Sequence, residues 1–77
     1  MTLELVVDLV RNQFIDIDSE SITADCQFKE LESYDSLTGM AILSSIEDDF
    51  NIMIPVEEYR QLNTIQDIHE YLEKKLL

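Results

Sequence analysis

The sequence predicts an all-α fold: a small four-helix bundle with three longer helices, one short helix, and a long loop between helices one and two. Apolar residues recur at helical spacing in three segments, and no segment shows strand-like alternation of useful length. The chain has 77 residues, of which 45% are hydrophobic, with one glycine and one proline. This size and composition are typical of one compact domain, so we expect residues 1–77 to form a single domain.

The first helix is expected over residues 3–15. Thr2 precedes it as a candidate N-cap, and Glu4 in the first turn interacts favourably with the helix dipole. Its apolar residues recur at the i, i+3, i+4, i+7 and i+11 positions of one helix face: Leu3, Val6, Val7, Val10 and Phe14.

Residues 16–35 lose this periodicity and are rich in Asp, Ser, Thr and Glu, which predicts a long loop. Structureless connections longer than about 12–15 residues are uncommon and are usually functional. Isolated apolar residues are expected to anchor the loop to the core: Ile17, Ile22, Phe28 and Leu31.

The second helix is expected over residues 36–50, with Asn51 closing it. Gly39 inside this helix costs about 0.5–1 kcal/mol relative to alanine, and we interpret it as room for a partner or for a bound group. The face predicted to be buried comprises Gly39, Ile42, Leu43, Ile46 and Phe50.

Two further helices complete the bundle. Pro55 at a first-turn position, followed by Glu57 and Glu58, is typical of a helix start, and one or two turns fit before Asn63. The last helix is expected over residues 65–76. Thr64 and Asp67 resemble a capping box before it, Lys74 and Lys75 suit its C-terminus, and its apolar face comprises Ile65, Ile68, Leu72 and Leu76.

Charge is the strongest compositional signal. The chain has 17 acidic and 5 basic residues, a net charge of -12, and Lys29 is the single basic residue between Asn12 and Tyr59. Such a protein repels nucleic acid and anionic membranes and attracts proteins with basic patches. The alternative is that the acids only keep a small domain soluble.

Three of the acids stand where they oppose a helix dipole. Glu47, Asp48 and Asp49 fall in the last turn of the second predicted helix, where they repel one another and the negative helix end. Local rules broken in this way often mark function. An ordinary solvated face is the other interpretation.

The sequence predicts a cytoplasmic protein. No apolar run approaches the length of a membrane span, and no basic region precedes the apolar residues near the N-terminus, as a secretory signal would require. Cys26 is the only cysteine, so an internal disulfide is impossible and a reducing compartment is expected. We assign Cys26 no functional role.

Ser36 occupies a distinctive position. If Asp35 is the N-cap of the second helix, Ser36 lies in the first turn, where backbone N–H groups lack partners and the helix end is partly positive. A phosphate on the Ser36 oxygen is stabilised there. The alternative is that Asp35 and Ser36 are competing caps and nothing more.

The chain resembles the acyl carrier protein family. Asp35-Ser36-Leu37 matches the motif in which the serine carries a phosphopantetheine arm. The resemblance extends over nearly the whole chain, in matching order and spacing: Phe28 and Leu31 before the motif, Glu47-Asp48-Asp49-Phe50 at the end of helix two, Ile54-Pro55 before the short helix, and Thr64-Ile65 opening the last.

The resemblance implies a carrier that is not itself an enzyme. Ser36, flanked by Asp35 and Leu37, would receive a covalent 4′-phosphopantetheine from coenzyme A through a phosphopantetheinyl transferase. Acyl groups would then be carried as thioesters to acyl-transferring or synthase enzymes with basic docking patches. We expect a monomer whose partner-binding residues are Leu37, Met40, Glu47, Asp48, Glu57 and Glu58.

Some of these assignments have alternatives. Core packing is the rival interpretation of Leu37 and Met40. The family commonly has glycine at the position of Ser33 and acids at those of Thr38 and Ala41, and this chain has none of the three. These departures from the family pattern favour a carrier dedicated to a specialised fatty acid, polyketide or related pathway. An aminoacyl or D-alanyl carrier, or an unmodified acidic adaptor that binds a basic partner, also remains open.

Catalytic and metal chemistry find little support. A serine hydrolase needs a base beside its serine, and the only histidine, His69, is more simply structural. Zinc cannot be held by one cysteine and one histidine. A calcium loop beginning at Asp16 lacks the required glycine at Ser21 and the glutamate at Gln27.

Overall fold

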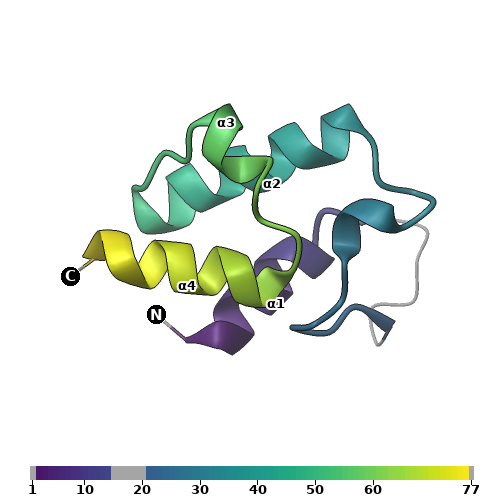
Figure 1. Cartoon of the computed structure of the whole chain (residues 1–77), viewed down its shortest axis with the longest axis horizontal. Coiled ribbons are helices and arrows are strands. Elements are labelled where there is room, and N and C mark those ends of the chain that lie inside the picture. The colour runs from purple at the N-terminus through teal and green to yellow at the C-terminus, as the bar shows by residue number, and fades with distance from the viewer. Residues whose placement is uncertain (1, 15–20, 77) are drawn as a thin grey trace.

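The computed structural model describes residues 2–14 and 21–76 and confirms the all-α prediction. The elements that lie wholly within the described residues are α1 (Leu3–Arg11), the short 3₁₀ helix η2 (Phe28–Glu30), α2 (Ser36–Phe50), α3 (Val56–Tyr59) and α4 (Ile65–Leu76). No strand occurs in the described residues. α1 packs against both α2 and α4, and Figure 1 shows the short α3 above α2.

α1 is shorter than predicted. The expected helix over residues 3–15 ends at Arg11, and its last predicted residue lies outside the described residues. The chain leaves the helix through tight turns, in which Phe14 N donates to Arg11 O at 3.1 Å. Phe14 is still only 9% exposed, so it is buried as its spacing predicted although it lies beyond the end of the helix. The Leu9 carbonyl, left without a helical partner, accepts a hydrogen bond from the Gln13 side chain at 3.0 Å.

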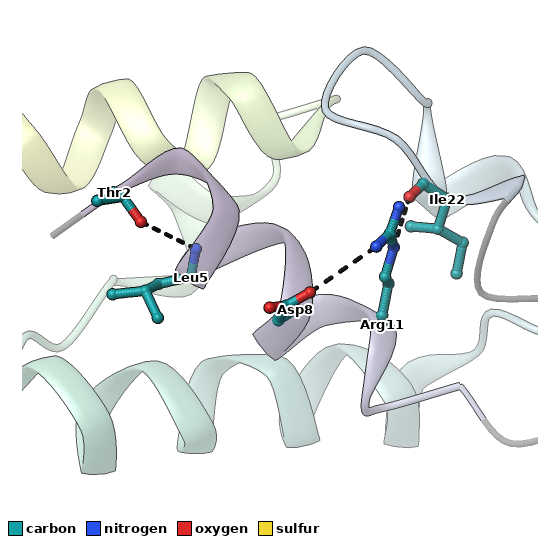
Figure 2. Close-up of polar contacts among 5 residues, drawn as sticks. All are labelled: Thr2, Leu5, Asp8, Arg11 and Ile22. Atoms are coloured by element: carbon teal, nitrogen blue, oxygen red, sulfur yellow. Dashed lines mark hydrogen bonds and ion pairs between the residues drawn. The ribbon is translucent and has the colours of Figure 1, made fainter.

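Arg11 ties the long connection back to α1. Its Nε donates to the backbone oxygen of Ile22 at 2.8 Å, and its guanidinium lies 3.8 Å from Asp8 (Figure 2). The same view shows the predicted N-cap at the other end of the helix, where Thr2 Oγ1 accepts from Leu5 N at 3.3 Å. The connection therefore enters the core beside the end of α1.

The predicted loop anchors are confirmed where they are described. Ile22 and Phe28 are fully buried, and Leu31 is partly buried against the core; Ile17 lies outside the described residues. Phe28 opens the 3₁₀ helix η2, which the sequence did not predict because three residues are too few to show a period.

The limits of α2 and α4 agree with the prediction. Asn51 closes α2 in the left-handed conformation, with φ 57°, and donates its N–H to Glu47 O. The predicted capping box opens α4: Asp67 N donates to Thr64 Oγ1 at 3.1 Å, and Thr64 N donates to Asp67 Oδ2 at 3.2 Å. Hydrogen bonds from the N–H groups of Asn63 and Thr64 lower the pKa of Asp67.

Pro55 differs from its expected place. It is the N-cap of α3 and not a first-turn residue, because its ψ of 145° is extended and Val56 is the first residue with helical geometry. Its carbonyl still accepts the first helical hydrogen bond, from Tyr59 N at 2.9 Å.

The core lies between the inner faces of α1, α2 and α4. Among the described residues no polar side chain is classed as buried, and none of their helices is long and apolar enough to cross a membrane. Burial of this apolar surface is the main stabilising term of the fold. The largest fully buried side chains are Phe28, Ile22, Ile42, Ile46, Ile65, Ile68, Leu72, Val6 and Val10.

Candidate functional site

Ser36 is the first residue of α2, and its side chain is exposed. Asp35 makes the helix cap: its Oδ1 accepts from Thr38 N at 2.9 Å and from Thr38 Oγ1 at 3.0 Å. These bonds lower the pKa of the Asp35 carboxyl. The Ser36 side chain forms no hydrogen bond with the rest of the described chain, so its hydroxyl is not used in the cap and is open to solvent.

The cap also changes the electrostatics expected at this helix end. The Asp35 carboxylate already occupies the Thr38 N–H, one of the donors that a phosphate on Ser36 was predicted to meet. A phosphate there would share the first turn with this carboxylate, and the two negative charges would repel each other.

Ser36 also lines a groove of about 370 Å³ between α2 and α3. Lys29 and Arg60 both line it, although neither was a predicted site residue. Lys29 could have been noticed from the sequence as the one basic residue in a long acidic segment, whereas nothing in the sequence around Arg60 predicts a place in this groove. The lining comprises Lys29, Tyr34, Ser36, Gly39, Met40, Leu43, Val56, Tyr59 and Arg60.

Two tyrosines meet inside the groove. The hydroxyls of Tyr34 and Tyr59 lie 3.0 Å apart in a hydrogen bond. Burial, and then the bond to Tyr34, raise the pKa of Tyr59. Lys29 Nζ donates to the Tyr59 backbone oxygen and lies 4.0 Å from the centre of the Tyr59 ring. Burial lowers the pKa of Lys29, against an opposing effect of the Asp67 carboxylate.

This tyrosine pair corrects the interpretation of Gly39. A Cβ on Gly39 would lie 2.5 Å from the Tyr34 hydroxyl oxygen and 3.7 Å from Tyr59 Cε2. The space beside Gly39 is therefore filled by the protein's own side chain and is not room for a partner. Gly39 permits the close approach of Tyr34, whose ring packs edge-on against Phe28 at 5.9 Å.

The structure separates the two interpretations of the apolar residues beside Ser36. Leu37 is 75% exposed and Met40 is 67% exposed, so they do not pack in the core. The acids predicted to bind partners are exposed as well, on α2 and on α3; Glu58 also accepts a hydrogen bond from Tyr71 at 3.0 Å. These acids are Glu47, Asp48, Glu57 and Glu58.

The remaining candidates show no catalytic arrangement in the described chain. His69 Nδ1 lies 3.3 Å from Glu73 Oε1 on α4, as a structural histidine would. Within residues 2–14 and 21–76 no three metal-ligating side chains cluster. Asp16, which would open the rejected calcium loop, lies outside those residues.

Comparison with known proteins gives this geometry a context. Residues 4–72 match the family model described as the phosphopantetheine attachment site. The chain belongs to the acyl carrier protein family. The acyl carrier protein of Phytoplasma australiense is 34% identical over 99% of both chains. That of Thermosynechococcus vestitus is 31% identical over 96% of this chain and 90% of its own, and that of Streptococcus thermophilus is 41% identical over 75% and 74%.

Membership of the acyl carrier protein family confirms 4′-phosphopantetheine as the cofactor. The site fits this group in two respects. Ser36 presents an exposed hydroxyl that no described residue engages, and the groove that Ser36 lines has room for part of an arm. Acyl carrier proteins act as carriers that work with synthases and transferases.

Proposed function

We propose that Ser36 is the attachment residue and that residues 1–77 form one carrier domain. The domain holds acyl intermediates as thioesters, presents them to partner enzymes and performs no bond chemistry of its own. The observation that carries this proposal is the exposed, unengaged hydroxyl at the first position of α2, between the capping residue Asp35 and the exposed Leu37.

In the attachment step, Ser36 Oγ attacks the phosphorus atom of coenzyme A that bears the pantetheine chain. A Ser36 O–P bond forms, the phosphoanhydride P–O bond breaks, and 3′,5′-ADP leaves. The serine proton passes to a base of the phosphopantetheinyl transferase. Asp35 supports the step by holding the start of α2 through Thr38, so that Ser36 stays at the surface. When bound, the arm supplies a terminal thiol that carries the acyl group.

Partner enzymes are proposed to dock on α2 and α3. Leu37 and Met40 provide exposed apolar contacts next to Ser36. Exposed acids on the same two helices attract basic patches on the transferase and on acyl-transferring or synthase enzymes, which makes association fast and salt-sensitive. The proposed acidic contacts are Glu47, Asp48, Glu57 and Glu58.

Modification of matched serine variants tests this proposal. After incubation with coenzyme A and a broad-specificity transferase, mass spectrometry is expected to show one added arm on the wild type and on Ser44→Ala, and none on Ser36→Ala. Ser44 is an exposed serine of the same helix. Ser36→Ala is expected to stay within about 0.5 kcal/mol of the wild-type stability, because it removes no hydrogen bond. An unmodified wild type, or a modified Ser36→Ala, contradicts the proposal.

We favour a specialised fatty acid, polyketide or related pathway and a cytoplasmic monomer. Ser33, Thr38 and Ala41 depart from the family pattern, and Thr38 instead bonds Asp35. An aminoacyl or D-alanyl carrier would share the arm and differ in cargo, which the mass of the group attached to the purified protein identifies.

An unmodified acidic adaptor is the candidate from another class. Ser36→Ala separates it from a carrier, because a carrier loses all acyl transfer whereas an adaptor keeps its affinity for a basic partner. Since Asp35 and not Ser36 caps α2, the adaptor's helix would be intact in this variant.

A further inference from the structure

We propose that the groove between α2 and α3 favours a short acyl cargo that ends in a carboxylate. Lys29 and Arg60 would hold the carboxylate, with a hydrogen bond from the Tyr34–Tyr59 pair. This inference rests on the proposed function, because the cargo reaches the groove on an arm attached to Ser36.

The first observation is a pair of cations without carboxylate partners. The chain has 17 acidic residues, yet neither Lys29 nor Arg60 forms an ion pair with an acid in the described residues. Asp67 acts on Lys29 through space, but its Oδ2 is engaged with the backbone N–H groups that open α4. Both cations line the groove, so an anion placed there would meet two positive charges that no carboxylate contacts.

These cations also retain hydrogen-bond capacity. Lys29 uses one donor on the Tyr59 backbone oxygen, and an ammonium group has three. The Arg60 guanidinium has five N–H donors, none of which is engaged by the described residues. A planar carboxylate is the ligand that a guanidinium accommodates best, through paired hydrogen bonds.

The tyrosine pair adds a further donor. Two hydroxyls carry two protons, and the single bond between Tyr34 and Tyr59 uses one of them. No other acceptor for these hydroxyls occurs among the described residues, so one O–H is left for an acceptor in the groove. The pair meets α2 at Gly39, about one helical turn beyond Ser36. An arm phosphate stays at Ser36, whereas the end of a cargo is free to reach this donor.

The groove is unsuited to a long apolar chain. Its volume of about 370 Å³ is near the lower limit of ligand pockets. Tyr34 fills the space beside Gly39 and packs against the fully buried Phe28. A long chain would have to displace this packing. The apolar walls at Met40, Leu43 and Val56 suit a few methylene groups between the arm and a charged end.

Tethering makes weak contacts effective. A flexible link raises the local concentration of a bound group to about the millimolar range. Contacts too weak to hold a free dicarboxylate would therefore be populated when the same group is attached through Ser36.

Two cargoes that differ at one end test the inference. Butyryl and succinyl groups, linked by a stable amide in place of the thioester, are transferred to Ser36 from the corresponding coenzyme A analogues, and mass spectrometry verifies loading. NMR then follows the titration of the ¹³C-labelled succinyl carboxyl and the amide signals of Gly39 and Tyr59. The arm and its phosphate are identical in both samples, so a difference arises only from the carboxylate.

The expected result has a definite sign. If the cations hold the carboxylate, it binds its proton about two- to fivefold more weakly than on the free analogue, the range that an exposed ion pair supplies. The net charge of -12 alone would strengthen proton binding. Succinyl, and not butyryl, is expected to shift the Gly39 and Tyr59 signals. Lys29→Met and Arg60→Met should each weaken these effects, whereas Lys74→Met, a control on α4, should leave them unchanged.

The possible failures are distinguishable. If both cargoes are attached but the succinyl carboxyl titrates as on the free analogue or at higher pH, the inference is overturned and the proposed function stands. If no analogue attaches to Ser36, the proposed function fails and the inference falls with it. The comparison of butyryl with succinyl cargo on the wild-type protein distinguishes these outcomes even if a variant does not fold.

Discussion

Gly39 lies where the Tyr34 hydroxyl closely approaches α2. In an isolated helix, Gly39→Ala would stabilise by about 0.5–1 kcal/mol. Here the added Cβ would lie 2.5 Å from the Tyr34 oxygen, so Tyr34 must move and its bond to Tyr59 is lost. Overpacking of this kind costs about 1–3 kcal/mol, which exceeds the gain in helix propensity, so we expect Gly39→Ala to lower the free energy of unfolding by about 1 kcal/mol, as measured by urea denaturation.

The effect of Gly39→Ala on the free energy of unfolding should change sign when the Tyr34 hydroxyl is absent. In a Tyr34→Phe background the nearest remaining Tyr34 atom, Cζ, is 3.4 Å from the added Cβ, and helix propensity then decides. Gly39→Ala is expected to stabilise Tyr34→Phe by about 0.5 kcal/mol. Destabilisation of equal size in both backgrounds would show that the hydroxyl is not the obstacle.

Asp67 gives the capping box a dependence on pH. Bonds to the backbone N–H groups of Asn63 and Thr64 lower its pKa in the folded state, so the folded protein binds the proton less readily than the unfolded chain. Its contribution to stability is therefore present above the unfolded pKa of about 3.9 and is lost as the pH falls through the lower folded pKa. Thermal melting between neutral and acidic pH should show a smaller loss for Asp67→Asn than for the wild type. An equal loss in both would exclude Asp67 as a source of the pH dependence.

The sequence correctly predicted residues whose roles depend only on neighbouring positions in the chain. Asp35 as the cap and Ser36 in the first turn follow from a few neighbouring positions. Tyr59 and Arg60 were missed because they meet Ser36 only where α3 lies against α2, and Tyr34 was missed because its role depends on the contact with Tyr59. Gly39 was noticed but misread, since the hydroxyl that explains it belongs to the loop before the helix.

Acidic side chains at the end of α2 oppose the helix dipole. Glu47 and Asp48 are exposed near the negative end of the helix, and no basic residue lies in its last turn. Glu47→Gln with Asp48→Asn should raise the free energy of unfolding by a few tenths to about 1 kcal/mol. The same change should slow association with a basic partner enzyme, as measured by stopped-flow at low salt.

A matched pair of acids outside α2 provides the control. Glu30→Gln with Glu32→Gln removes the same charge from exposed positions before the helix. It should relieve general repulsion without touching the α2 dipole, and so stabilise less and slow association less. Equal effects of the two double variants would mean that net charge alone, and not this helix end, is recognised.

The first and last residues of a helix could be predicted where a capping side chain marks them. α2 and α4 begin and end as expected, because Asp35, Asn51 and the Thr64–Asp67 pair are side-chain signals within the sequence. α1 was predicted too long because Phe14 keeps the helical spacing even though the backbone has already turned. Periodicity reports burial, and a turn can bury a residue as well as a helix can.

The whole molecule carries its net charge of -12 on a body with a Cα radius of gyration of 11.4 Å. At about 10 mM salt the screening length is about 30 Å and every acid repels every other, whereas at about 1 M it is about 3 Å. Sodium chloride should therefore raise the melting temperature, by about 4–8 °C for each 1 kcal/mol of repulsion removed. A melting temperature that is flat or falls with salt would contradict a stability limited by self-repulsion.

The attachment of the arm to Ser36 is the claim on which the account rests, and site-resolved mass spectrometry of the modified protein tests it most directly. Fragmentation should place the entire added mass on Ser36 and leave the nearby Ser33, Ser44 and Ser45 bare. An arm found on any other residue, or no arm after treatment with an active transferase, would contradict the account.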